Sequence, residues 1–210
     1  MEVLRTPDER FRDLVDFPFE PHYINIDDED GGTIRMHYID EGFPDGELIL
    51  CMHGQPNWSY SFRKMIMPLA EAGFRVIVPD IIGFGRSDKP TKRSDYTFSR
   101  HVAWLRNFIE GLDLRNINLI AQDWGGPIAL RNAADMPERF ARIVATNTGL
   151  GDGTGIPEEK APELRRLLDE TPALLLRRLL SGPSVLKMVG RVFFIGSSTV
   201  MLTRILILGR

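Results

Sequence analysis

Short apolar runs alternate with helical patterns along most of the chain. Four largely apolar runs have the length of buried strands, and they lie at 48–52, 76–78, 117–121 and 143–145. Before them, Ile34, Met36 and Tyr38 alternate with polar neighbours, which is typical of a strand with one buried face. Apolar residues at helical spacing predict helices over 63–72, 102–112 and 127–134. Buried strands that alternate with helices predict an α/β fold with a mostly parallel sheet covered on both faces.

The pattern changes near residue 150. Residues 149–162 are rich in glycine and proline, which predicts a mobile connection and a domain boundary there. None of the 29 acidic residues lies beyond Glu170, whereas 171–210 holds six basic residues among many apolar ones. Three interpretations fit this segment: helices that pack on the rest, a damaged or truncated C-terminus, or a basic amphipathic surface for anionic lipid or a partner. We therefore divide the chain into 1–150 and 151–210.

Composition excludes several classes of protein. The net charge of −3 gives no overall attraction to nucleic acid. A single cysteine, Cys51, excludes an internal disulfide framework and fits a reducing compartment, so we expect a cytoplasmic protein. The start of the chain is too polar for a secretory signal, and the apolar run at 192–203 is too short to span a bilayer. A membrane partner is therefore not expected.

One motif points to chemistry. Directly after the third buried run comes Ala-Gln-Asp-Trp-Gly-Gly at 121–126, followed by a predicted helix. This strand–turn–helix pattern matches the nucleophile elbow of α/β hydrolases, with Asp123 where serine usually stands. Small residues are needed around so sharp a turn because side chains there would collide with neighbouring backbone. Asp123 should then project from the carboxyl edge of the sheet, where ligands bind in open α/β folds.

Two more loops follow buried strands. His-Gly-Gln-Pro-Asn-Trp at 53–58 stands where this fold donates one backbone N–H to an oxyanion hole, and the residue after the nucleophile donates the other. The expected donors are the N–H groups of Gln55 and Trp124. The glycines of the loop at 79–88 permit a tight turn, and Asp80 is expected to order it through local hydrogen bonds. His53 is expected to be structural, bonding the backbone of its own loop.

Together these three segments resemble the haloalkane dehalogenases of the α/β-hydrolase superfamily. The resemblance covers about residues 17–150, and the Gln-Asp-Trp-Gly-Gly and His-Gly-Gln-Pro-Asn-Trp-Ser stretches are specific in combination. It implies an α/β-hydrolase core, with the start of a helical cap after the strand ending near Ala145. It implies no organic cofactor and no metal. The partners that it implies are a small haloalkane and water, and the complete protein is expected to be a monomer.

The resemblance also implies a mechanism in which Asp123 displaces a halide from carbon and forms an alkyl ester. The indole N–H of Trp124 suits the leaving halide, because it can only donate. Gln55 is the second halide donor that we favour, since the three tryptophans, Trp58, Trp104 and Trp124, all precede residue 150. A water activated by a histidine, itself oriented by an acid, would hydrolyse the ester to a primary alcohol.

The base and the acid are not evident in this chain. In this superfamily the order is nucleophile, acid, histidine, yet all four histidines precede Asp123; they are His22, His37, His53 and His101. Asn147 occupies a position where an acid could follow the fourth buried strand, and Asp152 is the nearest alternative. The strands that would carry the usual acid and histidine are not evident after 150. We interpret the chain as the front half of the catalytic domain with part of a cap, and we expect at most the first half-reaction.

Two alternatives stay open. Epoxide hydrolases use the same aspartate nucleophile and a similar His-Gly-x-Pro loop, but they protonate the epoxide with cap tyrosines. The tyrosines here all precede residue 150; they are Tyr23, Tyr38, Tyr60 and Tyr96. The second alternative is a catalytically incomplete fragment that lacks its base and acid.

Overall fold

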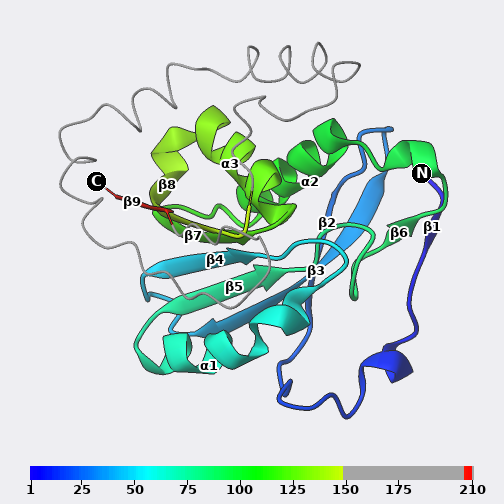
Figure 1. Cartoon of the computed structure of the whole chain (residues 1–210). Helices are drawn as coiled ribbons and strands as arrows, with labels where there is room; N and C mark the ends of the chain where they lie inside the picture. The colour runs from blue at the N-terminus through cyan, green and yellow to red at the C-terminus, as the bar shows by residue number, and fades with distance from the viewer. Residues whose placement is uncertain (149–205, 210) are drawn as a thin grey trace, which may run out of the picture.

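The structure, a computed structural model, describes residues 1–148 and 206–209. Its centre is a sheet of seven strands in the spatial order β2-β3-β5-β4-β7-β8-β9 (Figure 1). Their bounds are β2 His22–Asp27, β3 Thr33–Gly42, β4 Leu48–Met52, β5 Arg75–Pro79, β7 Ile117–Gln122, β8 Phe140–Thr146 and β9 Leu206–Gly209. The central strands β5, β4, β7 and β8 are parallel, whereas β3 and β9 run antiparallel to their neighbours. The predicted α/β-hydrolase fold with its mostly parallel sheet is confirmed.

Helices cover both faces of this sheet. One face carries α1 (Arg63–Glu71), and the other carries α2 (Phe98–Gly111) and α3 (Gly125–Asp135), as Figure 1 shows. Shorter elements join them: the strands β1 (Val3–Leu4) and β6 (Lys89–Pro90), and the 3-10 helices η1 (Asp8–Phe11), η2 (Ser59–Phe62), η3 (Arg93–Asp95) and η4 (Pro137–Arg139).

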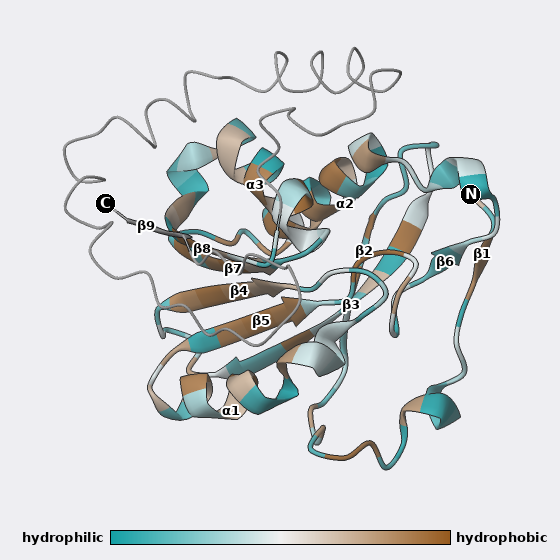
Figure 2. Cartoon of the chain, viewed as in Figure 1, coloured by the Kyte–Doolittle hydropathy of each residue, from teal (hydrophilic) through white to brown (hydrophobic). Residues whose placement is uncertain are grey.

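The core lies in two layers because side chains of a strand alternate between the faces. All five residues of β4 are buried; Leu50 and Met52 join the cluster under α2 and α3, whereas Ile49 and Cys51 join the cluster under α1. Figure 2 shows β4 and β5 as a strongly hydrophobic band at the centre of the molecule. Packing on both faces holds these strands in place, and the candidate site lies at their carboxyl ends.

The helix α2 is positioned by its cap and by its apolar face. The hydroxyl of Thr97 accepts a hydrogen bond from the Arg100 N–H at 3.2 Å, which satisfies one of the unpaired donors at the start of a helix. Trp104 and Phe108 are fully buried one turn apart. The helix therefore rests on the sheet with its first turn at the carboxyl edge.

The buried strands and the helices predicted from the sequence are confirmed, with bounds that differ by a few residues. Two strands of the seven-stranded sheet, β2 and β9, were missed, as were the two-residue strands β1 and β6. In β2 only Ile26 is buried, and the alternation of Ile24 and Ile26 with polar residues is short. The strand β9 was not predicted, and for 206–209 it replaces the interpretation of packed helices, because this segment pairs with the edge of β8.

The predicted mobile connection, the domain boundary, the helical cap and most of the basic tail lie outside the described residues. Among the residues that the structure does describe, no helix combines the length and the apolar character needed to cross a membrane.

Candidate active site at the carboxyl ends of β4, β5 and β7

Asp123 lies in a sharp turn between β7 and α3. Its φ of 49° is in the left-handed region, where a residue with a side chain is strained. Three hydrogen bonds hold this conformation: the Asp123 N–H donates to the Asn147 carbonyl at 3.2 Å, and the Asp123 carbonyl accepts from the Gly126 N–H at 3.0 Å and from the Thr148 hydroxyl at 2.7 Å. The predicted nucleophile is thus held in a fixed orientation at the strand end.

Two glycines permit the close approach of the turn to the loop after β4. A side chain at Gly125 would overlap the backbone carbonyls of His53 and Met52. A side chain at Gly54 would overlap the side chain of Asp123. The sequence argument for small residues around the elbow therefore has a physical basis in contacts between two separate loops.

Gln55 meets Asp123 as the sequence predicts. Its backbone N–H donates to Oδ1 of Asp123 at 2.8 Å, so one carboxylate oxygen is held while Oδ2 stays available for other contacts. Trp124 is the residue before α3, where the helix dipole places partial positive charge. Its side chain is 50% exposed, so Trp124 is not part of the core.

Beside this contact lies a cavity of about 340 Å³. Gln55 and Trp124 line it, together with Phe84, Tyr96 and His101. Its size is that of a site for a small molecule, and its walls are largely aromatic and aliphatic. The Tyr96 hydroxyl already donates to the Pro90 carbonyl at 2.9 Å. The arrangement places an anionic oxygen next to a partly apolar space with few polar groups.

His53 is fully buried and uses both ring nitrogens. Nε2 accepts the Ile81 N–H at 2.9 Å, which makes Nδ1 the protonated nitrogen, and Nδ1 donates to the Gly54 carbonyl at 2.9 Å. Burial lowers the pKa of His53, although the charge of Asp80 acts in the opposite direction. The expected structural role is borne out: the neutral ring joins the loop that carries Gln55 to the loop after β5.

Asp80 is the second buried anchor of these loops. Its carboxylate accepts bonds at 2.8 Å from the N–H groups of Ser59 and Arg86 and contacts Nδ1 of His37 at the same distance. Burial acts to raise the pKa of Asp80, but the hydrogen bond and the charge of His37 outweigh it and hold this pKa below its ordinary value. The local order expected around Asp80 is present, and it extends further along the chain than expected.

His101 is the residue whose placement the sequence indicates least. It lies in the first turn of α2, and its imidazole packs edge-on against Trp104, with ring centroids 5.1 Å apart. Burial lowers the pKa of His101 to about 4, so the ring is neutral near pH 7. No described residue bonds its buried Nδ1 atom. The two aromatic residues at the start of this helix, Tyr96 and Phe98, are the sequence signal that could have indicated a cavity wall.

The predicted site residues Asp123, Gln55 and Trp124 are thus brought together. Asn147 reaches the site through its backbone carbonyl, and Asp152 lies outside the described residues. Within residues 1–148, His53 and His37 are committed to the bonds described above, and neither is aimed at Asp123.

Comparison with known proteins supports the fold. A sequence model of the alpha/beta hydrolase fold family matches residues 47–178. A haloalkane dehalogenase of Psychrobacter cryohalolentis is 54% identical over 153 residues, which cover 73% of this chain and 50% of that protein. A haloalkane dehalogenase of Mycobacterium marinum is 46% identical over 187 residues, which cover 89% of this chain and 63% of that protein. The chain spans about half to two thirds of the length of these curated relatives.

Solved structures of two kinds of enzyme share this fold. The tetrameric haloalkane dehalogenase DpaA from Paraglaciecola agarilytica NO2 superposes with a TM-score of 0.70 at 42% identity, covering 88% of this chain and 62% of that one. An epoxide hydrolase mutant of Vigna radiata gives a TM-score of 0.53 at 31% identity, and the match covers 60% of this chain and 38% of that one.

Proposed function

This chain belongs to the α/β hydrolase fold family, and from that premise we propose that it carries the nucleophilic half of a haloalkane dehalogenase site. The observation that carries the proposal is the strained turn of Asp123, whose carboxylate takes the Gln55 N–H at 2.8 Å beside a cavity of about 340 Å³. The substrate class is a small haloalkane, as the names of the similar proteins suggest.

In the first step Oδ2 of Asp123 attacks the carbon that bears the halogen. The carbon–oxygen bond of an alkyl ester forms while the carbon–halogen bond breaks, and the halide leaves with the bonding electron pair. The indole N–H of Trp124 and the side-chain amide of Gln55, which both line the cavity, would donate to the leaving halide. Oδ1 is the natural choice for the ester carbonyl, because the Gln55 N–H already holds it.

In the second step water attacks the ester carbon derived from the Asp123 carboxylate. Negative charge then develops on Oδ1, where the N–H groups of Gln55 and Trp124 would form the oxyanion hole. This step needs a base. The histidines of this sequence all precede Asp123, and His53 has both nitrogens engaged. We therefore expect the 210-residue chain to stop at the ester, whereas a chain with the base and the acid would release a primary alcohol.

The test is made on the purified, folded chain with 1-bromobutane, by bromide determination and intact protein mass. One bromide per chain, with a stable butyl adduct on Asp123, is the expected result. Asp123→Ala should give neither bromide nor adduct; bromide release by this variant would remove Asp123 from the mechanism. Many bromides per parent chain would instead show that a base acts at this site.

Epoxide hydrolysis is the alternative that the same experiment separates. Styrene oxide in place of 1-bromobutane should give no adduct, because ring opening needs a proton donor. Of the tyrosines, Tyr96 lines the cavity, yet its hydroxyl already donates to the Pro90 carbonyl. An adduct with the epoxide but not with the bromide would favour the alternative.

We also propose a domain boundary near residue 150, a monomer and a cytoplasmic location. The last rests on the single cysteine, Cys51, which is fully buried, and burial raises its pKa to about 12. The molar mass of the complete protein, measured by light scattering, tests whether it is a monomer; the similar protein DpaA is a tetramer.

A further inference from the structure

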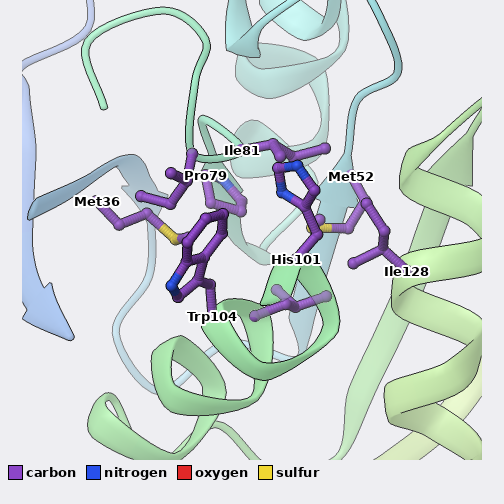
Figure 3. Close-up of a pocket in the computed structure, with 9 residues that line it drawn as sticks. Met36, Met52, Pro79, Ile81, His101, Trp104 and Ile128 are labelled. Atoms are coloured by element: carbon purple, nitrogen blue, oxygen red, sulfur yellow. The ribbon is translucent and has the colours of Figure 1, made fainter. Parts of the chain in front are cut away.

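A second, smaller space lies next to the cavity beside Asp123. The inner space has a volume of about 10 Å³, which is room for about one water molecule. Trp104, Leu105, Met36 and Met52 line it, so it is almost wholly apolar. Figure 3 shows Trp104, Met36 and Met52 among the side chains that line this space, together with His101 and Ile128.

Three residues line both spaces: Ile81, His101 and Ile128. These shared residues therefore lie where the outer cavity, which Gln55 and Trp124 also line, meets the inner space beneath α2. The backbone N–H of Ile81 is bonded to His53, so this residue is fixed by the loops of the site. Ile128 belongs to α3 and is 3% exposed within the main core cluster.

The imidazole of His101 is held by ring contacts with Tyr96 and Trp104 and not by hydrogen bonds to described residues. Its buried Nδ1 has no hydrogen-bond partner among the described residues, and neither does Nε1 of the adjacent Trp104. Removal of the imidazole therefore breaks no hydrogen bond within the described part of the chain. It would add the space of the ring to the inner space and join the latter to the outer cavity.

We propose that the imidazole of His101 is the partition that ends the substrate cavity, and that it thereby limits the length of the alkyl chain that the site accepts. The inference rests on the proposed function for the identity of the substrate. A neutral ring suits this place, because a charged one would face apolar side chains on the inner side.

The three tryptophans allow a test that does not depend on chemistry at Asp123. Trp124 lines the outer cavity, Trp104 lines the inner space, and Trp58 packs in the other core layer. The full chain is labelled with 5-fluorotryptophan and titrated with 1-octanol, and the fluorine resonances are followed by NMR. In the parent chain we expect the Trp124 resonance to shift while the Trp104 and Trp58 resonances stay.

In His101→Ala the Trp104 resonance should shift as well, since the octyl chain reaches the inner space. Leu105→Ala is the matched control: Leu105 lies one helical turn away, on the same helix, and lines the inner space alone. It enlarges that space without opening the partition, so its Trp104 resonance should not respond to 1-octanol. His101→Phe restores a ring and should behave as the parent does.

A second variant guards against misfolding of the first. Ile128→Ala opens the boundary between the two spaces from α3 and should also expose Trp104 to 1-octanol. The inference is overturned if Trp104 responds in the parent chain, or if it stays silent in both opened variants. Absence of any Trp124 response overturns it too, because the outer cavity would then take no alkyl chain.

Alkylation separates this inference from the proposed function. His101→Ala should raise the rate of adduct formation with 1-bromooctane relative to 1-bromobutane, by roughly four-fold for each further methylene buried. If Trp104 responds in His101→Ala but no chain forms an adduct, the partition stands and the dehalogenase proposal fails. An adduct whose chain-length preference is unchanged in both opened variants overturns the partition and leaves the proposal for Asp123 standing.

Discussion

Acid should destabilise the folded chain through His101. Burial lowers the pKa of this side chain from 6.5 to about 4, so between these values the unfolded chain binds a proton that the folded chain does not. The contribution of the neutral His101 ring to the free energy of unfolding is therefore complete above pH 6.5 and is lost as the pH falls towards 4. The whole difference corresponds to about 3 kcal/mol, of which about 2 kcal/mol is lost between pH 7 and pH 5.

His101→Phe removes this titration while keeping a ring in place. We expect its free energy of unfolding, measured in urea at pH 7 and pH 5, to fall by about 2 kcal/mol less than that of the parent chain. The other titrating groups, including His53, are common to both chains and cancel in the comparison. Leu105→Ala is the control, because it costs about 2–5 kcal/mol at either pH and leaves the pH dependence parallel to that of the parent. An equal fall for the parent and for His101→Phe would refute the reasoning.

Three further predictions concern the loops of the site. Gly54→Ala should abolish alkylation of Asp123, measured by intact protein mass, since the new methyl overlaps the nucleophile. Its control is Gly73→Ala, in a turn with φ 97° and open space around it, which should leave alkylation unchanged and lower the free energy of unfolding in urea by about 1 kcal/mol. Thr148→Val removes the hydroxyl that donates to the Asp123 carbonyl, and it should lower the free energy of unfolding by about 1 kcal/mol and slow adduct formation; an unchanged rate would mean that the turn holds without this bond. Asp80→Asn replaces a buried carboxylate that accepts two backbone bonds, and it should lower the free energy of unfolding by about 3–5 kcal/mol; a loss under 1 kcal/mol would show that the charge is dispensable.

The central part of the fold could be predicted because its residues carry local signals. The strand β4 is an unbroken apolar run, and the elbow at Asp123 combines small residues with a strand before it and a helix after it. The strand β2 gives no such signal, since Ile26 is its one buried residue and its place depends on pairing with β3.

Some contacts of the site could likewise be expected from the sequence, and others could not. The contact between Gln55 and Asp123 could be expected because both follow strands of one parallel sheet. The bond between His37 and Asp80 joins strands that pair antiparallel, over 43 positions of sequence, and no periodicity indicates it. The place of His101 between two cavities depends on how α2 rests on the sheet, which a single sequence does not specify.

The hydrogen bond from Gln55 to Asp123 also has a consequence for the order of folding. It spans 68 positions of sequence, and it can form only after β4 and β7 lie side by side in register. Contacts of such separation carry a large entropic cost of loop closure, so they are completed late. A partly folded chain should therefore present Asp123 as an ordinary surface carboxylate. Acquisition of reactivity towards a bromoalkane during refolding would then time the completion of the native sheet, independently of any spectroscopic probe.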